Sequence, residues 1–238
     1  MNHTYAYIIS LFFVVVTLKA QDTTAVAQQN PVVIDSIVNK EKFGLRVGTD
    51  LYKLARTAFD DDYSGFEVMA DYRVIGNWYA AAELGNEQRT TFDDNITSKG
   101  SGSYFNLGFD YNMHNNWVGL NNMIHGGLRY GVSAFSQELI DYTVATTNPI
   151  FGQDTRVSPV EYEGLNAQWI ELLIGVKAEV FNNLFLSINV QLKRKLSESE
   201  PANFENLYIP GFNRTYEDSS FGVGFGYGIS YLIPFFKK

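Results

Sequence analysis

The strongest constraint on the fold lies in residues 220–235, where apolar and small residues alternate without a break. The odd-numbered residues are all apolar or aromatic: Phe221, Val223, Phe225, Tyr227, Ile229, Tyr231, Ile233 and Phe235. The even-numbered residues are Ser220, Gly222, Gly224, Gly226, Gly228, Ser230, Leu232 and Pro234. Successive side chains of a strand point to opposite faces, so one face is apolar and the other is nearly bare. Small inward residues suit a small closed barrel, whose walls lie close together, and the apolar face would then contact lipid.

The same alternation recurs in seven earlier stretches, which we predict to be strands at residues 43–53, 65–75, 78–88, 102–112, 123–137, 166–180 and 184–196. The connections after the second, fourth and sixth strands are the shorter set, as in bacterial outer-membrane barrels. An even number of strands then leaves both termini in the periplasm. The pattern predicts an all-β fold, an eight-stranded antiparallel up-and-down transmembrane β-barrel with a polar interior plugged by its own side chains.

Aromatic residues support a membrane location for this barrel. Five of them are expected on the outer face at the periplasmic strand ends, where an interfacial girdle belongs: Phe43, Trp78, Tyr111, Tyr231 and Phe235. The alternative is a soluble exported barrel or sandwich in which the same apolar faces form the core. Glycine on the polar face of almost every strand, the strand length and the girdle favour the membrane barrel.

The N-terminus indicates export. Residues 1–20 resemble a cleaved signal peptide, although no Lys or Arg precedes the apolar run, and the alternative is an uncleaved anchor helix. Residues 21–41 form a polar periplasmic lead segment, and residues 42–238 form the barrel. A net charge of −8 argues against nucleic-acid binding, and the absence of cysteine excludes a lipid-anchored lipoprotein and thiolate metal sites. We therefore expect the protein in the outer membrane of a Gram-negative bacterium.

Charged residues of both signs fall on the predicted inward face in near balance. Seven of them form the predicted lumen network: Arg46, Asp71, Glu83, Asp110, Arg129, Glu171 and Lys177. Unpaired buried charge is costly, so we expect ion pairs that close the lumen. The alternative is a pathway for protons or ions, which would make the protein a narrow channel or transporter.

The sequence offers little for catalysis. Downstream of residue 20 the only histidines are His114, in a periplasmic turn, and His125, which faces inward. A Ser or Thr nucleophile at the extracellular rim would have no histidine as base. Acidic loop stretches such as residues 60–62 match no calcium-loop spacing and are interpreted as solvated surface. We expect no catalytic residue, cofactor or metal, and an outer-membrane lipid-modifying enzyme using carboxylates is the alternative.

The loop at residues 197–218 departs from the polar pattern of the others. It contains four residues that form a candidate partner contact: Tyr208, Ile209, Pro210 and Phe212. An exposed aromatic patch requires cover, either from the barrel mouth or from another protein. The turn at Pro210 and Gly211 favours presentation to an envelope protein partner. Membrane lipid and lipopolysaccharide are the other expected partners.

Four motifs resemble an uncharacterised family of outer-membrane β-barrels from Bacteroidota: residues 104–112 ending in Asp110-Tyr111-Asn112, Asn121-Asn122-Met123-Ile124, Gly127-Leu128-Arg129-Tyr130-Gly131, and Ile209-Pro210-Gly211-Phe212. The resemblance spans the whole predicted barrel. It implies the same fold and location, and it implies no activity. The sequence therefore predicts a small non-enzymatic barrel with a structural or partner-binding role in the cell envelope.

Overall fold

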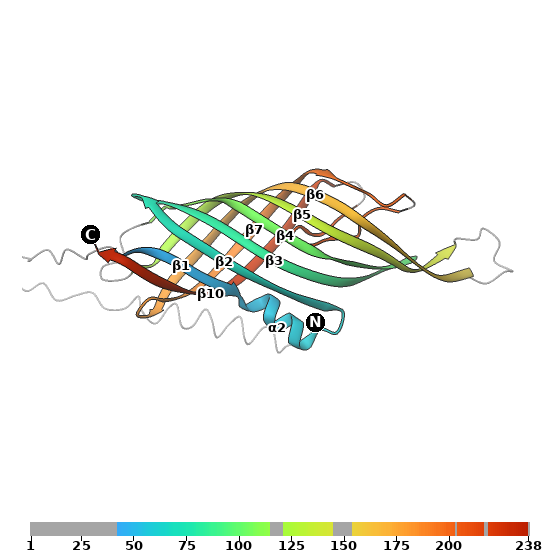
Figure 1. Ribbon diagram of the computed structural model, residues 1–238, viewed down its shortest axis with the longest axis horizontal. Coiled ribbons are helices and arrows are strands. Elements are labelled where there is room, and N and C mark those ends of the chain that lie inside the picture. The colour runs from blue at the N-terminus through green and yellow to red at the C-terminus, as the bar shows by residue number, and fades with distance from the viewer. Residues whose placement is uncertain (1–41, 115–120, 145–153, 203, 217–218, 238) are drawn as a thin grey trace, which may run out of the picture. The chain divides into compact units, whose positions relative to one another are not determined.

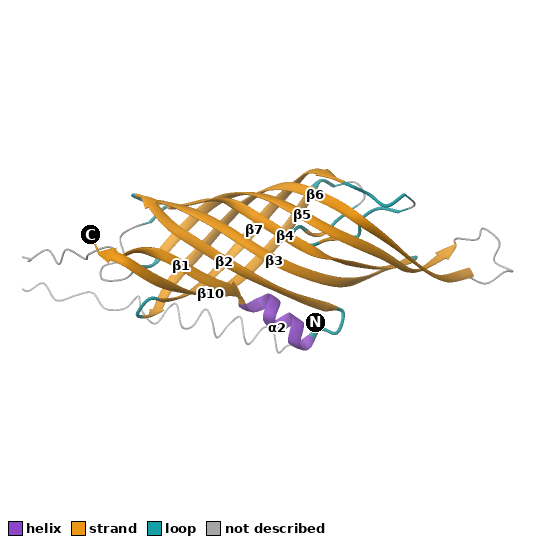
Figure 2. Ribbon diagram, viewed as in Figure 1, coloured by secondary structure: helices purple, strands orange, loops and turns teal. Residues whose placement is uncertain are grey.

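The computed structural model describes residues 42–114, 121–144, 154–202, 204–216 and 219–237, and strands dominate this part of the chain (Figures 1 and 2). The long strands are β1 (Lys42–Asp50), β2 (Tyr63–Ile75), β3 (Trp78–Asp93), β4 (Ile96–Asn112), β5 (Met123–Val144), β6 (Asp154–Phe181), β7 (Leu184–Glu198) and β10 (Phe221–Lys237). The helix α2 spans Leu51–Phe59, and two short strands, β8 (Tyr208–Ile209) and β9 (Asn213–Arg214), pair with each other.

The long strands close into a barrel in the order β1-β10-β7-β6-β5-β4-β3-β2, and every neighbouring pair is antiparallel. Strands adjacent in the chain are adjacent in the barrel, so the predicted up-and-down order of eight strands is confirmed. Two of the connections predicted to be short, those after β2 and β6, contain residues with positive φ, Gly76 at 51° and Asn183 at 67°. Glycine and asparagine tolerate this conformation best, which explains why these short connections close here.

The two faces of the barrel have the polarity expected from the alternation. On the outside, Ile174 and Val190 are 66% and 64% exposed. On the inside, the carboxylates of Asp110 and Glu171 have no exposed surface. A water-soluble protein distributes these residue types the other way round. The predicted outward aromatic residue Trp78 packs against a second one, Tyr111, with 4.9 Å between ring centroids.

No helix in the described residues is both long and apolar enough to cross a membrane. The predicted signal peptide at residues 1–20 and lead segment at residues 21–41 lie outside the described residues.

Several strands extend beyond their predicted ends. Residues 89–101, which lie between the predicted strands 78–88 and 102–112, are mostly paired strand, because β3 and β4 continue as a hairpin up to the pair formed by Asp93 and Ile96. β5 and β6 likewise remain paired as far as Val144 and Asp154. Backbone hydrogen bonds continue here without apolar alternation, so a criterion based on hydrophobic pattern ends these strands too early.

The predicted end of the first strand is wrong. It was expected to reach Lys53, but β1 stops at Asp50 and the helix α2 follows. The Asp50 carboxylate accepts a hydrogen bond of 2.9 Å from the backbone N–H of Lys53, which is a helix N-cap. The helix is rich in Leu, Ala, Lys and Arg, which all have high helix propensity. It ends at Phe59, and the carboxylate of the following residue, Asp60, accepts a bond of 2.8 Å from Arg56.

Candidate functional site

The helix α2 follows β1 at a place where the barrel wall lacks a strand. β1 pairs with β10 only as far as Asp50 opposite Gly228, and with β2 only as far as Thr49 opposite Val68. Residues 221–227 of β10 and residues 63–67 of β2 therefore have no strand partner on this side. Figure 1 shows α2 continuing from β1 beside this end of β2. The helix takes the place that a longer β1 would occupy.

Side chains near the helix bind part of the exposed strand edges. The hydroxyl oxygen of Thr57 lies 2.8 Å from both the backbone N and the backbone O of Gly65 on β2. Thr49 donates a bond of 2.6 Å to the carbonyl of Glu67. On the β10 side, the Asp50 carboxylate accepts a bond of 3.2 Å from the N–H of Tyr227. These contacts replace ladder hydrogen bonds and hold α2 against the wall.

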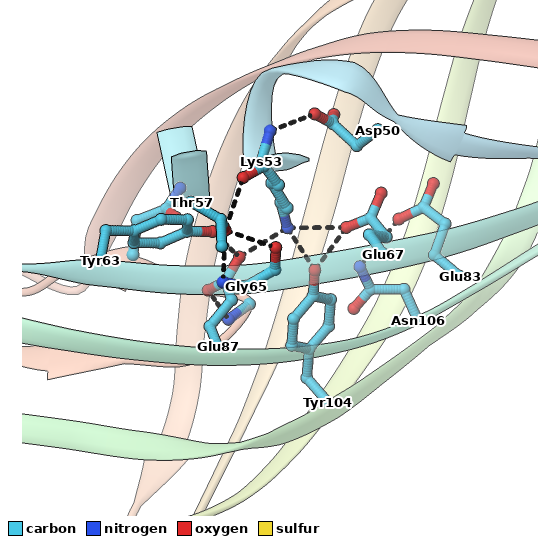
Figure 3. A network of polar contacts seen from close by, with 12 residues as sticks. Asp50, Lys53, Thr57, Tyr63, Gly65, Glu67, Glu83, Glu87, Tyr104 and Asn106 are labelled. Carbon is cyan, nitrogen blue, oxygen red and sulfur yellow. Dashed lines mark hydrogen bonds and ion pairs between the residues drawn. The ribbon is translucent and has the colours of Figure 1, made fainter. Parts of the chain in front are cut away.

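The helix directs Lys53 into the barrel, where it meets two carboxylates (Figure 3). The ammonium group lies 2.7 Å from Glu67 and 2.6 Å from Glu87, on the neighbouring strands β2 and β3. The hydroxyl of Tyr104, on β4, contacts both Lys53 and Glu67. One cation therefore neutralises two carboxylates from different strands and ties the helix to them.

Glu87 also holds the loop between β7 and β10. Its carboxylate accepts hydrogen bonds from the hydroxyl of Tyr63 at 3.2 Å, the hydroxyl of Tyr208 at 2.6 Å and the N–H of Gly211 at 3.0 Å. Burial, together with the charge of Glu87, raises the pKa of the Tyr208 phenol well above its usual range. The phenol stays protonated at physiological pH and remains a donor to Glu87.

The loop that the sequence offered as a partner contact folds into the barrel mouth. Tyr208, Ile209 and Phe212 are at most 2% exposed, and Pro210 is buried with them. The Phe212 ring packs edge-on against Trp169 on β6, with 5.9 Å between centroids. The structure thus shows the alternative in which the barrel itself covers this patch. In this arrangement the four residues are not accessible to an envelope protein.

The predicted lumen network lies deeper in the barrel. Its members form a chain of ion pairs at the following separations: Arg46–Asp71 at 2.7 Å, Asp71–Lys177 at 2.7 Å, Lys177–Asp110 at 3.4 Å, Asp110–Arg129 at 2.7 Å and Arg129–Glu83 at 3.5 Å. Glu171, the seventh predicted member, pairs instead with Lys193 at 3.6 Å. The structure therefore brings six of the seven residues into one network and places the last beside it.

Residues that the structure describes line a larger and a smaller cavity inside the barrel. The larger has a volume of about 500 Å³ and lies behind α2, where its lining includes Lys53, Glu83 and Tyr208. The smaller, of about 30 Å³, lies among the residues of the deeper network and has room for water. His125 lines the smaller cavity, and the described lining of the larger one contains no histidine. Among the described residues no group of acidic, histidine or cysteine side chains could hold a metal ion.

Sequence reasoning missed Lys53 as a lumen residue because it placed this segment on a strand. A helical signal was present: Leu51, Leu54, Ala55 and Ala58 fall on one side at helical spacing, while Lys53 and Arg56 fall on the other. Asp50 supplied the capping residue. Tyr63 and Tyr104 were missed for another reason, since a tyrosine shows no preference for either face until its hydroxyl has a partner.

The site combines a cavity, a charged lining and an aromatic cap, which suits binding better than acid-base catalysis. Searches among curated proteins and among solved structures find no match to this chain. A family model does match residues 4–238, which is almost the whole sequence. The chain therefore belongs to the family described as "Domain of unknown function (DUF6048)".

Proposed function

We propose that this protein is a small outer-membrane β-barrel that is closed to conduction and has a non-enzymatic, structural or partner-binding role in the cell envelope. One observation carries the membrane location: large apolar side chains are exposed around the barrel while charged side chains fill its interior. An apolar surface of this extent would aggregate in water, and lipid is the solvent in which it is stable.

The absence of conduction follows from how the interior is filled. The ion-pair chain from Arg46 to Glu83 crosses the lumen, and the cavity beside it measures only about 30 Å³. Tyr208 and Phe212 are buried in the mouth of the barrel. An eight-stranded barrel has just enough interior for side chains to fill it, so we expect these contacts to interrupt any aqueous path.

A partner-binding role is supported by the β5–β6 hairpin. Figure 1 shows the paired ends of these strands extending past the other strands of the barrel. They carry exposed apolar residues, with Val157 74% and Val160 41% exposed. This hairpin replaces the loop at Tyr208 as the surface that we propose for an envelope protein.

Single cysteines test the membrane location and topology, because the chain has no native cysteine. On whole cells, an impermeant thiol reagent should label cysteine at position 61 or 200, in connections at the proposed extracellular end. It should not label cysteine at position 77 or 182, in turns at the opposite end. Equal labelling of all four variants on intact cells would contradict the proposed insertion.

A photo-crosslinking residue tests the partner-binding surface. Placed at Val157 on the projecting hairpin, it should form an adduct with a protein on whole cells. The matched control is Leu172, an exposed residue of β6 that faces outward within the barrel wall. Protein adducts of equal yield at both positions, or none at Val157, would remove the hairpin from the proposal.

A further inference from the structure

We propose that the larger cavity binds a single-chain amphiphile with an anionic headgroup, and that the amphiphile enters from the membrane between α2 and β10. The inference rests on the proposed membrane location of the barrel. The proposed structural role requires no ligand in this cavity, so the inference goes beyond that role.

The barrel wall is incomplete beside the cavity. β10 has no strand partner over residues 221–227, and only part of its edge is bound by side chains. Asp50 accepts from the N–H of Tyr227, and the side chain of Asn213 donates to the carbonyl of Val223 at 3.2 Å. The Tyr52 ring packs on Phe225 with 4.6 Å between centroids. Side-chain contacts of this kind seal a wall less completely than a ladder of strand hydrogen bonds.

The cavity lining includes residues of both barrel faces. Its interior part contains charged side chains such as Glu67 and Lys193. Its outer part contains Val190, Val223 and Phe225, which are 64%, 70% and 51% exposed on the apolar face. A cavity that joins an apolar outer surface to a polar interior fits a molecule with an apolar chain and a polar head.

The cavity lining favours a negatively charged headgroup. Arg89 lines the cavity with its guanidinium 5.3 Å from the centre of the Tyr208 ring, and no carboxylate of the described residues lies within ion-pair distance of it. The carboxylates of the lining are engaged elsewhere, for example Glu67 and Glu87 with Lys53. An anionic headgroup would give Arg89 the partner that the protein does not supply.

The size of the cavity suits a ligand with one chain, and its position beside α2 suits entry from the membrane. A volume of about 500 Å³ falls within the range of small-molecule sites and suits one chain better than the several chains of a larger lipid. Tyr208 and Phe212 are buried in the barrel mouth above the cavity. The edge of β10 beside α2, which pairs with no strand over residues 221–227, is the entry that we propose for a molecule arriving from the membrane.

Native mass spectrometry of the full chain in a neutral detergent tests the proposal. Three probes distinguish the contribution of the acyl chain to binding from that of the headgroup. They are palmitoyl lysophosphatidylglycerol, which is anionic; palmitoyl lysophosphatidylcholine, which is zwitterionic; and glycerol phosphate, which has no acyl chain. We expect a complex of one anionic lysolipid per barrel, with about tenfold weaker binding of the zwitterionic lipid, because its choline cation offsets the charge of its phosphate and is repelled by Arg89. Glycerol phosphate should not bind measurably.

Three variants locate the site. Arg89→Gln should abolish the preference for the anionic lysolipid. Gly224→Phe should abolish binding, because a side chain at Gly224 enters the cavity, where its first carbon would lie 2.6 Å from the Gln191 side chain. Arg194→Gln is the matched control, since Arg194 also lies over an aromatic ring but does not line the cavity. It should bind like the parent.

The proposal is overturned if no one-to-one complex forms, if glycerol phosphate binds as well as the lysolipid, or if Arg89→Gln and Arg194→Gln bind alike. Should Gly224→Phe fail to fold, Arg89→Gln decides alone. Thiol labelling of whole cells is independent of the ligand. Correct topology without lysolipid binding would refute this inference only, whereas failed labelling would refute the proposed membrane location.

Discussion

Replacing Lys53 with methionine is expected to destabilise the barrel, because this lysine is the cation shared by two buried carboxylates. Its ammonium lies within 2.7 Å of Glu67 and Glu87, whose side chains are 9% and 1% exposed. Methionine has a similar length but carries no charge. The variant would leave both carboxylates without their cation and would loosen the attachment of α2 to the barrel.

The expected magnitude follows from the burial of these groups. Removing one partner of a buried ion pair costs about 3 to 5 kcal/mol, because the remaining charge is desolvated and unpaired. The Lys53 side chain is 15% exposed and borders a cavity of about 500 Å³, so water can reach the carboxylates. We therefore expect a loss of about 3 kcal/mol in the free energy of unfolding, at the lower end of that range.

The assay is urea-induced unfolding of the barrel refolded in lipid vesicles, followed by tryptophan fluorescence. The control is Lys99→Met, which removes a half-buried lysine that pairs with no carboxylate among the described residues and should change stability by less than about 0.5 kcal/mol. The triple variant Lys53→Met, Glu67→Gln, Glu87→Gln should recover most of the loss, since it leaves no unpaired charge. If Lys53→Met unfolds at the same urea concentration as Lys99→Met, the shared-cation argument is wrong.

Three further predictions test the cap, the deeper network and the wall. Phe212→Ala should lower the free energy of unfolding by about 3 to 5 kcal/mol, and the half-buried Phe204→Ala of the same loop by less, in the same urea assay. Arg129→Met should cost about 3 to 5 kcal/mol by breaking its pair with Asp110, while planar-bilayer recordings show no conductance. Conductance steps in that variant would favour a channel. Thr57→Val should cost about 1 to 3 kcal/mol, because it leaves the backbone groups of Gly65 without their partner, and hydrogen exchange at this edge should rise. Unchanged exchange would show that Thr57 does not hold the strand edge.

The sequence determined the features that depend on a regular alternation of residue types along the chain. Strand side chains alternate faces, so residues 220–235 were enough to assign an apolar and a small-residue face, and the same pattern located all eight strands. The inward position of charges such as Asp110 and Arg129 follows from the same alternation. Membrane insertion itself stays a proposal, since alternation describes which residues share a face and leaves open whether lipid or protein covers it.

Only the tertiary structure decided which inward groups meet and what fills the openings. Asp71 bridges Arg46 and Lys177 because closing the barrel brings β1, β2 and β6 together across the lumen. The aromatic residues around Phe212 lie inside the barrel because the Phe212 ring packs against Trp169 in the mouth. The helix α2 occupies the wall because β1 ends before its neighbours do. The helical spacing and the Asp50 cap are present in the sequence, but only the pairing of β1 with β2 and β10 shows where β1 stops.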